Sequence, residues 1–510
     1  MIDKLIPHDK VKELFILAIL LAAAIRLYLF WQYYCISSDG LHYIDAAKEF
    51  WAGKLGAGLS SVYPPGYPFI ITCFYALIGD WELAGQVPSI IAGILLVWPL
   101  FLLYRDAFGE ANALVACFLL AISPFLARYS AHVRSESVYF FLSSIALLLF
   151  FRGIERNNLR QFLYGGLIAG FAYLVRPEAI GFLLIIPSYW VVRWFYQRRP
   201  NFIWIAKSCA LMGIGFFLFA LPYIVYLSID TGRWGALSRK AGVTLAVSIK
   251  ESGLIAANDS VDGGDTDSMD VDEFVRKHPG IYLKKVALDI LPATAVFFEA
   301  LHYSYVPFLL LGMTIIFQRR FWERKDFLLL IFVLFYVFGF TLIYVKRRYS
   351  LQAVPFALGW VALGFGILWT YAAQKISAKR GKFILFSILA LFLASTLPKT
   401  LTPISREKGY VRETGWYLRK HYPADRLRVA VFDDRVTFYS GSTPLLLTDV
   451  TEIDLARFLR KEKANYLASD SKFIQRFYPG VAQNPRDYGL VMEHEFVGTR
   501  KDRMLLFKVM

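Results

Sequence analysis

Long apolar runs alternate with short polar stretches over the first four hundred residues of this 510-residue chain. A helix needs about 20 mainly apolar residues to cross the hydrocarbon core of a bilayer. The pattern predicts a polytopic α-helical membrane protein with about eleven spans, near residues 11–31, 86–104, 111–128, 137–152, 161–176, 179–195, 203–226, 304–318, 327–345, 351–371 and 383–397.

The basic residues predict which way the chain crosses. Lys and Arg are retained on the cytoplasmic side of a membrane, and here they gather in every other loop, as in the stretches 152–160, 193–207, 319–325 and 375–382. The N-terminus is therefore expected inside and the C-terminus outside. A further apolar run, 66–78, is short, and counting it as a span would put the later arginines outside. We interpret it as an interfacial helix.

Two larger regions and one terminal segment are predicted on the outer side. The transmembrane domain, residues 1–397, carries outer loops at 32–85 and 227–303. The more polar residues 398–510 are expected to form a small extracytoplasmic α/β domain, with a helix in 403–425, another at 452–463, and strands at 427–432 and 504–509. Within the second loop, 271–278 and 281–291 are predicted helices, and the acidic stretch 259–272 lacks calcium-loop spacing and is expected to be a solvated loop.

Composition supports this class and excludes others. The chain is 57% hydrophobic, 17% aromatic and only 19% charged, unlike an ordinary soluble enzyme. Its net charge of +16 lies in alternating loops, so no nucleic-acid partner is expected. The four cysteines are scattered and no phosphate-binding glycine motif is present, so no zinc, redox or nucleotide site is predicted.

The first outer loop carries the most informative residues. Asp39 stands directly after the first span, and Tyr43, Ala46, Ala47 and Phe50 follow at helical spacing, which predicts an amphipathic interfacial helix. Asp39 suits the N-cap of this helix about as well as it suits catalysis. A proline-rich bend at 63–68 is expected to begin the second interfacial helix.

Several cations lie where the positive-inside rule does not expect them. Lys346, Arg347 and Arg348, followed by Tyr349, end a span on the outer side. They are either a snorkelling anchor or a site for an anionic ligand. Arg26 lies inside the first span and needs a buried partner, for which Asp39 or Glu136 would serve.

The order of these features resembles the GT-C superfamily of membrane glycosyltransferases, in the branch of protein mannosyltransferases and aminoarabinose transferases. The matching features are the acid that opens the first outer loop, the Tyr four positions later, the Pro-Pro helix start, and Ser123-Pro124 at the end of the third span. The polar sequence His-Val-Arg-Ser-Glu at 132–136 completes the pattern. The resemblance covers residues 20–195 well and the span arrangement to about residue 400 loosely.

The resemblance implies a monosaccharide donor linked to polyprenyl phosphate and a lipid, glycan or protein acceptor, in the inner membrane with the site facing the periplasm. It implies that Asp39 is the catalytic base or a metal-site residue and Glu136 a second catalytic acid, although Gly40 stands where the family often has another acid. Substrate-binding roles are implied for Tyr43, Arg134, Lys346, Arg347, Arg348 and Tyr349.

This chemistry is physically reasonable. A carboxylate can take the acceptor proton as the glycosidic bond forms, and the departing phosphate needs cations. No cofactor is predicted, although a divalent metal held by a His with Glu136 or Asp39 stays open. Arg176 and Glu178 are further candidates at another outer turn, and Arg134 and Glu136 could instead form only a local ion pair.

The rival function is a membrane transporter or lipid-glycan flippase, since many spans could also carry a solute. Transporters place ionisable residues near the midplane, within broken helices. Most charged candidates here stand at outer helix ends, which favours glycosyl transfer. A scaffold that presents residues 398–510 is a third interpretation and predicts no role for Asp39.

Overall fold

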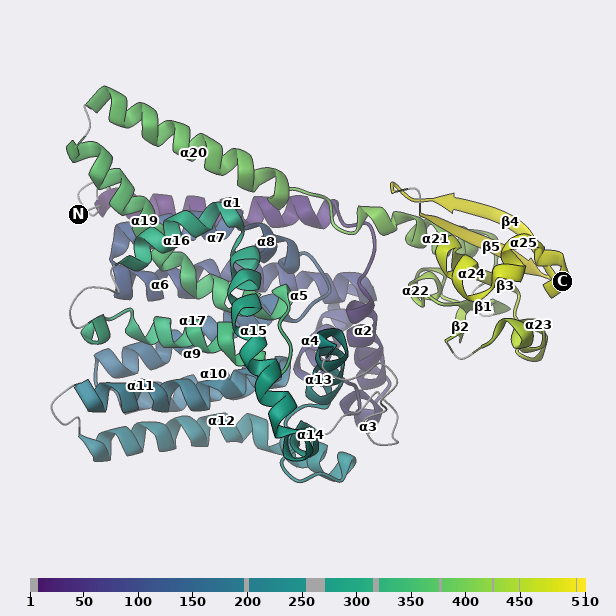
Figure 1. The fold of residues 1–510 in the computed structure, drawn as a ribbon, viewed down its shortest axis with the longest axis horizontal. Helices are drawn as coiled ribbons and strands as arrows, with labels where there is room; N and C mark the ends of the chain where they lie inside the picture. Colours follow the sequence, from purple (N-terminus) through teal and green to yellow (C-terminus); the bar gives the residue numbers. More distant parts are fainter. Residues whose placement is uncertain are drawn as a thin grey trace. The chain divides into compact units, whose positions relative to one another are not determined.

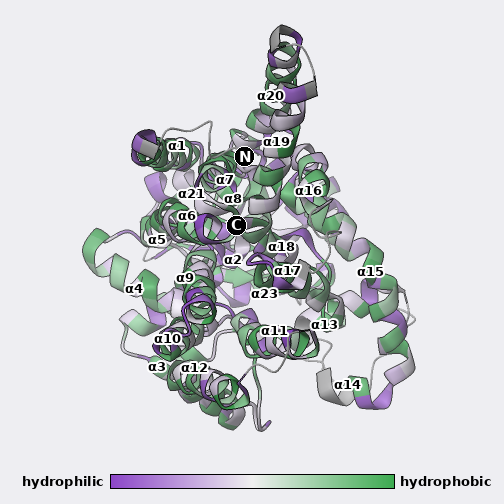
Figure 2. Ribbon diagram, turned by 90° about the vertical axis from the view of Figure 1, so that its left-hand side faces the viewer, coloured by the Kyte–Doolittle hydropathy of each residue, from purple (hydrophilic) through white to green (hydrophobic). Residues whose placement is uncertain are grey.

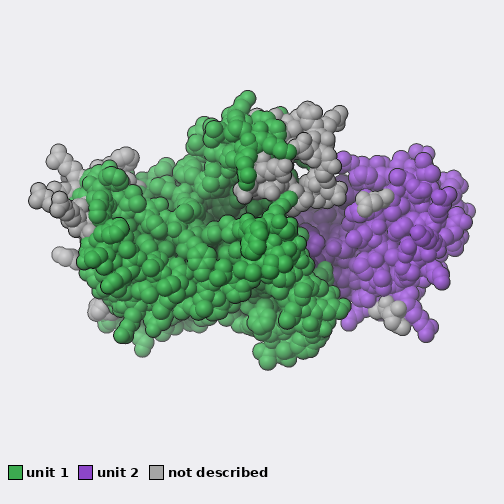
Figure 3. All heavy atoms as spheres, turned by 90° about the horizontal axis from the view of Figure 1, so that it is seen from below, with its two compact units in different colours: residues 1–28, 43–402 green, residues 29–42, 403–510 purple. Residues whose placement is uncertain are grey.

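A computed structural model describes residues 8–196, 201–253, 271–314, 321–375, 378–423, 426–448, 450–500 and 502–510. The chain divides into two compact units, coloured separately in Figure 3. One comprises residues 1–28 and 43–402, and the other comprises residues 29–42 and 403–510. The acidic stretch 259–270 lies outside the described residues, and so does most of the prediction made for it.

The first unit is a helical bundle whose hydrophobic residues appear green in Figure 2. Helices long and apolar enough to cross a membrane coincide with predicted spans, and α7 and α8 form a pair bent by 60°. The bundle helices in Figure 1 are α1 (Val11–Trp31), α5 (Trp81–Leu95), α6 (Val97–Phe108), α7 (Glu110–Ile122), α8 (Pro124–Ser130), α9 (Glu136–Glu155), α10 (Leu159–Val175), α11 (Phe182–Tyr196), α12 (Phe202–Thr231), α16 (Val306–Met313), α17 (Phe327–Phe338), α19 (Val354–Lys375) and α20 (Ala378–Thr400).

The polytopic fold class is confirmed, while the number of crossings stays a prediction. Among the described residues, seven helices pass the length and hydropathy test, or eight when the bent pair counts as one span. Three shorter apolar helices, Leu159–Val175, Tyr303–Met313 and Phe327–Leu342, coincide with the remaining predicted spans. A fourth, α4 (Gly66–Ile78), is the segment interpreted as interfacial.

Small residues let neighbouring helices approach closely, as is common in membrane bundles. A Cβ atom built on Gly170 of α10 would lie 2.3 Å from the carbonyl oxygen of Phe216 in α12. One turn further along α10, at its C-terminal end, a Cβ atom on Gly66 of α4 would lie 2.7 Å from the carbonyl oxygen of Leu174. Side chains at either glycine would force these helices apart, so α4 is held against the end of α10.

The two loops predicted to be the outer loops are largely helical. The first contains α2 (Ser38–Trp51), α3 (Leu55–Leu59) and α4, and the second contains α13 (Arg239–Ser252), α14 (Val271–Lys277) and α15 (Pro279–Leu301). The predicted helix 281–291 is real but longer, because Pro279 suits the first turn of a helix and starts α15 there. In Figure 1, α15 runs across the direction of the bundle helices.

The connection between α17 and α19 is irregular. It consists of the 3₁₀ turn η7 (Gly339–Leu342), an extended stretch to Lys346, the short helix α18 (Arg347–Ser350) and the turn η8 (Leu351–Ala353).

The second unit contains a five-stranded sheet of order β2-β1-β3-β5-β4, which confirms the predicted α/β domain. Strands β1 (Arg428–Val431), β2 (Thr443–Leu446) and β3 (Tyr466–Asp470) are parallel, and β5 (Arg503–Val509) joins β3 and β4 (Leu490–Val497) as antiparallel partners. The predicted strands correspond to β1 and β5. The predicted helices correspond to α21 (Gly409–His421) and α23 (Glu452–Lys461); the remaining helices are α22 (Arg435–Ser440), α24 (Ser471–Phe477) and α25 (Pro479–Gln483).

Residues 29–42 belong to this second unit. Ile404 donates its backbone N–H to the carbonyl of Gln32 (2.8 Å), and the N–H of Ile36 donates to the Tyr439 hydroxyl (2.7 Å). Arg412 donates to the carbonyl of Tyr33 (3.0 Å). The stretch that leads from α1 to Asp39 is therefore held by the C-terminal residues.

Candidate active site

A cavity of about 240 Å³ within the helical unit collects most of the charged candidates. Its walls come from six separate parts of the chain, and they combine aromatic and aliphatic groups with three cations and one carboxylate. The lining residues are Tyr43, Tyr63, Pro64, Val175, Arg176, Pro177, Glu178, Ile180, Leu237, Ser238, Lys240, Ala241, Thr244, Phe340, Ile343, Arg348 and Tyr349.

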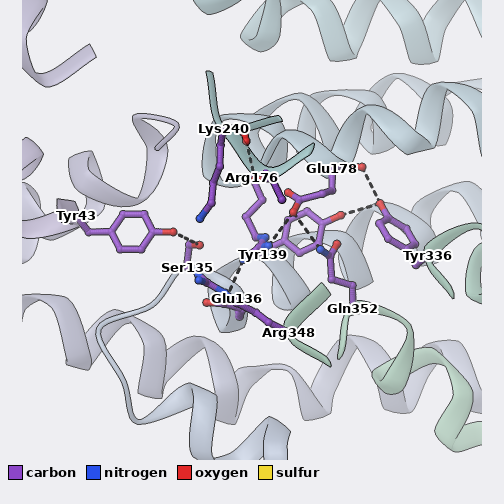
Figure 4. Close-up of polar contacts among 11 residues, drawn as sticks. Tyr43, Ser135, Glu136, Tyr139, Arg176, Glu178, Lys240, Tyr336, Arg348 and Gln352 are labelled. Atoms are coloured by element: carbon purple, nitrogen blue, oxygen red, sulfur yellow. Dashed lines mark hydrogen bonds and ion pairs between the residues drawn. The ribbon is translucent and has the colours of Figure 1, made fainter. Parts of the chain in front are cut away.

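Proline chemistry places Arg176 and Glu178 in this cavity. Pro177 cannot continue α10 and disfavours a helical conformation in the residue before it. Arg176 accordingly adopts an extended backbone, with φ −150° and ψ 128°. One guanidinium nitrogen then lies 2.7 Å from Glu178 Oε1 and another lies 3.0 Å from Glu136 Oε1. Figure 4 shows Arg176 between the two carboxylates.

Glu136 begins α9, where the helix dipole favours a negative charge. The residue is fully buried, and a charge buried this way needs partners. Arg348 of α18 donates to the same Glu136 oxygen that Arg176 contacts. Glu136, predicted as a second catalytic acid, is thus brought together with Arg348, one of the three cations predicted as a site for an anionic ligand.

Glu178 is held by a second network. The Gln352 side-chain amide donates to Glu178 Oε1 (3.2 Å), and the Tyr336 hydroxyl donates to the Glu178 backbone carbonyl (3.0 Å). The hydroxyls of Tyr336 and Tyr139 lie 2.7 Å apart. Sequence analysis did not single out Gln352, Tyr336 or Tyr139, because nothing local distinguishes them from ordinary residues of apolar helices.

Several buried polar atoms around the cavity keep hydrogen-bonding capacity. Within the described ranges, Glu136 Oε2, Glu178 Oε2 and Arg176 Nε have no hydrogen-bond partner. Buried polar groups are normally satisfied, and an unmet one costs about 1–3 kcal/mol. A ligand that carries both an anionic group and hydrogen-bond donors would satisfy the arginine nitrogen and the two carboxylate oxygens.

Tyr43 lies in this site as predicted for a substrate-binding residue, although its role stays a prediction. Its hydroxyl is 2.9 Å from the Ser135 hydroxyl, and its ring contacts the rings of Tyr63 (centroids 4.4 Å apart) and Tyr67 (5.0 Å). Burial raises the pKa of Tyr43 to about 12, so the phenol stays protonated at physiological pH.

Lys240 is a cavity residue that sequence analysis missed. It is the second residue of α13, in the outer loop 227–303, and its amino group lies 4.0 Å from the centre of the Tyr63 ring. The available signal was a run of basic residues, 239–240, directly after a Ser that suits a helix N-cap. The acidic residues farther along the same loop are the stronger signal in the sequence.

The outer basic triplet does not act as one group. Arg348 lines the cavity with Tyr349, whose ring stacks on Phe340 (centroids 4.9 Å apart). Arg347 pairs instead with Glu299 of α15 (2.6 Å), and Lys346 pairs with Glu251 of α13 (3.6 Å). Neither Lys346 nor Arg347 lines the cavity.

Two other predicted residues have different surroundings. Arg134 lies over the ring of Tyr129, with its guanidinium carbon 5.0 Å from the ring centre. Asp39 belongs to the second unit, in the first turn of α2, and is partly exposed. The N-cap interpretation of Asp39 is wrong, because the helix begins at Ser38 and the Ser37 hydroxyl accepts the N–H of Gly40 (3.2 Å).

The predicted pairing of Arg26 with a carboxylate is also wrong. Its guanidinium donates to the carbonyls of Ala22 (3.1 Å) and Ala121 (3.5 Å). Glu136, one of its proposed partners, is instead occupied by the cations of the cavity. Arg26 donates to a carbonyl of its own helix and to one at the end of α7, where the chain bends. An argument from side chains alone does not consider such backbone partners.

In the part of the chain that is described, no three His, Cys, Asp or Glu side chains gather where they would hold a metal ion. His132, the histidine nearest to Glu136 in sequence, is partly buried. Burial lowers its pKa well below 6.5, and the charges of Arg134 and Arg128 lower it further.

Comparison with known proteins agrees with this architecture. The sequence model of the family described as dolichyl-phosphate-mannose-protein mannosyltransferase matches residues 62–226, which include much of the cavity wall. Among curated proteins, none matches the chain by sequence.

Solved structures extend the similarity to nearly the whole chain. The apo oligosaccharyltransferase of Archaeoglobus fulgidus matches 91% of this chain and 70% of its own, with a TM-score of 0.59 and 13% identity. ArnT from Cupriavidus metallidurans bound to undecaprenyl phosphate matches 97% of this chain and 98% of its own, with a TM-score of 0.55 and 13% identity. The chain has the GT-C fold.

The fold and the family match confirm the predicted resemblance to GT-C membrane glycosyltransferases. Another structure with this fold is the archaeal oligosaccharyltransferase AglB of Archaeoglobus fulgidus, in complex with an inhibitory peptide and a dolichol-phosphate. It matches 91% of this chain and 69% of its own, with a TM-score of 0.54 and 12% identity. The GT-C fold here carries the cavity at the junction of its outer loops and bundle helices.

Proposed function

We propose that this protein is a membrane glycosyltransferase that moves a monosaccharide from a polyprenyl-phosphate donor to a hydroxyl or similar acceptor on the outer, periplasmic face of the inner membrane. The observation that carries the proposal is the group of three cations, Arg176, Lys240 and Arg348, lining one cavity beside two carboxylates, the fully buried Glu136 and the partly buried Glu178. With Glu136 and Glu178 ionised, the five side chains sum to one positive charge, which matches a singly charged phosphodiester.

The donor class is supported by the fold and by the chemistry of the cavity. ArnT is bound to undecaprenyl phosphate in its structure and AglB is in complex with a dolichol-phosphate. Guanidinium groups bind phosphate oxygens in a fixed geometry. The apolar walls formed by Val175, Ile180 and Ile343 suit the sugar face or the first isoprene units of such a lipid.

The reaction would proceed as follows. The acceptor oxygen attacks the anomeric carbon while the bond from that carbon to the phosphate oxygen breaks. The electron pair leaves with the polyprenyl phosphate, and the cations stabilise the added negative charge. Asp39 takes the acceptor proton as general base, and Glu136 holds Arg176 and Arg348 at the phosphate.

The transporter interpretation is less well supported. It needs ionisable groups along a path near the midplane, whereas the cavity charges come from helix ends and outer-loop helices such as α13 and α18. The deeply placed Arg26 is engaged with backbone carbonyls.

Donor turnover by purified protein in lipid nanodiscs tests the proposal, with labelled polyprenyl-phosphate sugars as substrates. Asp39→Asn should lower turnover by about 100-fold or more, because a general base contributes that much, and should leave donor binding intact. Asp45→Asn is the matched control, since Asp45 is exposed and forms an ion pair with Lys48 (3.3 Å). Normal turnover by a folded Asp39→Asn variant would refute the assignment of the base.

A further inference from the structure

Side chains of helix α15 donate hydrogen bonds to three consecutive backbone carbonyls of the irregular segment between α17 and α18. The amino group of Lys285 donates to the carbonyls of Thr341 (2.7 Å) and Ile343 (2.8 Å). One turn earlier, the Tyr282 hydroxyl donates to the carbonyl of Leu342 (2.9 Å). The two side chains come from a helix some sixty residues away in sequence, so the contact is purely tertiary.

These carbonyls need partners that their own segment does not supply. The turn η7 ends at Leu342, and the residues from Ile343 to Lys346 are not helical before α18 begins. Carbonyls at the end of a helical turn have no partner within it, and buried backbone groups are almost always paired. Lys285 supplies the pairing, and it is itself only 1% exposed.

The chemistry of lysine suits this position better than that of other side chains. An ammonium group has three donors and no acceptor, and here it faces two carbonyls and the carboxylate of Asp289 (3.1 Å). Burial lowers the pKa of Lys285, and Asp289 opposes that change. Burying such a charge is costly, and Ala or Leu at this site would avoid that cost, so a specific contribution of the charged group is expected.

The segment that α15 holds leads directly to Arg348, one of the cations that line the cavity. Arg348 follows Ile343 by five residues, and α15 contacts the intervening chain again where Glu299 pairs with Arg347 (2.6 Å). Arg348 thus enters the cavity from a chain whose backbone α15 holds at residues 341–343, on the N-terminal side of α18. A misplacement of about 1 Å at a binding group can cost much of its effect.

We propose that Lys285 is a positioning residue for donor binding, which fixes the backbone of residues 341–343 so that Arg348 meets the donor phosphate. This proposal rests on the proposed function, because it assigns Arg348 to a phosphate. Lys285 touches neither the cavity nor the reacting atoms, and it acts through Arg348.

The experiment measures binding of undecaprenyl phosphate to the purified full-length chain in nanodiscs. Lys285→Met keeps the length of the side chain and removes its donors, and it should raise the Kd by about tenfold or more, equivalent to about 1.4 kcal/mol. Lys284→Met is the matched control, because Lys284 is the adjacent, exposed lysine on the same helix. It should bind within about twofold of wild type.

Non-additivity separates positioning from a general structural role. In an Arg348→Gln background, Lys285→Met should add little further loss of binding, since the group it positions is gone. In a Lys240→Gln background, the same substitution should again cost about tenfold. An equal loss in both backgrounds would overturn the proposal, and so would wild-type binding by Lys285→Met.

A milder variant keeps the test decisive if Lys285→Met does not fold. Tyr282→Phe removes one hydroxyl, and it should weaken binding by about two- to tenfold with the same dependence on Arg348, because one hydrogen bond contributes about 0.5–1.5 kcal/mol. No loss in this variant would then count against the proposal. If wild-type protein binds no undecaprenyl phosphate, the proposed function itself fails, which is a different result from equal binding by wild type and variant.

Discussion

Two buried arginines of the helical unit have opposite surroundings. Arg26 donates to one backbone carbonyl of its own helix and one at the end of α7. Arg176 lies between two carboxylates beside a cavity. Both are nearly inaccessible to solvent. From the sequence, Arg26 was expected to have an acidic partner, whereas Arg176 was a further candidate for the site. The difference between them shows that a buried positive charge is not by itself evidence of a binding site.

The region around Arg26 is explained by helix geometry. Pro124 ends α7 and the chain bends by 60° into α8, so the last carbonyls of α7 lose their helical partners. Side chains from three other elements replace them. The Tyr305 hydroxyl donates to Leu119 (3.1 Å), the Thr400 hydroxyl donates to Ile122 (2.7 Å), and Arg26 reaches Ala121.

The region around Arg176 differs, because carboxylate oxygens there have no hydrogen-bond partner in the described chain. In the described parts of the chain, one oxygen of Glu136 and one of Glu178 have no hydrogen-bond partner. Glu178 lines a cavity, and Glu136 pairs with two cations that line it. The carbonyls at the end of α7 instead accept hydrogen bonds from packed neighbouring elements. The guanidinium of Arg26 also keeps two nitrogens without a hydrogen-bond partner in the described chain. What indicates a ligand site at Arg176 is that groups with unmet capacity stand beside a cavity, which Arg176 and Glu178 line.

The largest effect is expected at Arg176. Arg176→Met should weaken binding of undecaprenyl phosphate by about 30-fold or more, because truncating one partner of a buried charged pair costs about 2–5 kcal/mol. Binding by the purified variant in nanodiscs, with its thermal stability measured in parallel, provides the check. Unchanged binding by a folded variant would remove the distinction between the two arginines.

The adjacent pair Arg347 and Arg348 sharpens the comparison within one segment. Arg348→Gln should weaken donor binding about 30-fold or more. Arg347→Gln should change it by less than about threefold, since Arg347 is 41% exposed and its pair with Glu299 is of the exposed kind that contributes little. Equal losses in the two variants would show that the triplet binds the phosphate as a group.

Tyr43→Phe tests the edge of the same region. Loss of the hydroxyl that contacts Ser135 should lower donor turnover by about two- to tenfold, the value of one hydrogen bond. Because the pKa of Tyr43 is about 12, its phenol is protonated throughout the range from about pH 6 to about pH 10. The pH profiles of variant and wild type should therefore run parallel, and a rise in the relative activity of the variant at high pH would contradict this.

The smallest functional effect is expected at Arg26. Two of its three guanidinium nitrogens have no hydrogen-bond partner within the described chain, so Arg26→Met loses little bonding and removes a costly buried charge. Donor affinity should stay within about twofold, and stability should change by about 1 kcal/mol. A large loss of donor binding would make Arg26 part of the site after all.

Much of the architecture could be predicted because it depends on local pattern. Apolar runs located the bundle helices, short strand-like runs located β1 and β5, and prolines located the ends of α7, α10 and α14. Strands β2, β3 and β4 were missed because each is short or has mixed polarity, and their pairing is a tertiary property. The site was predicted in part: Glu136, Tyr43, Arg348 and Tyr349 come together in or at the cavity, whereas Lys240 and Gln352 required the folded chain.

By itself the sequence determined the class of the protein. A chain this apolar must satisfy its backbone in lipid, and helices do so from local hydrogen bonds alone, so span positions and helix breaks are readable without any contact map. It also supplied the carboxylate and cation types that sugar transfer from a lipid phosphate requires.

Only the tertiary structure decided which charges meet. Arg347 and Arg348 are neighbours in sequence, yet one pairs with Glu299 and the other with Glu136. Arg26 and Arg176 are both buried, yet Arg26 donates to a backbone carbonyl where α7 ends, and Arg176 borders a cavity. Electrostatic interactions depend on distance and burial in three dimensions, and side chains one position apart on α18 point toward different helices. The charges that make a site are therefore selected by packing, after the sequence has determined the helices that carry them.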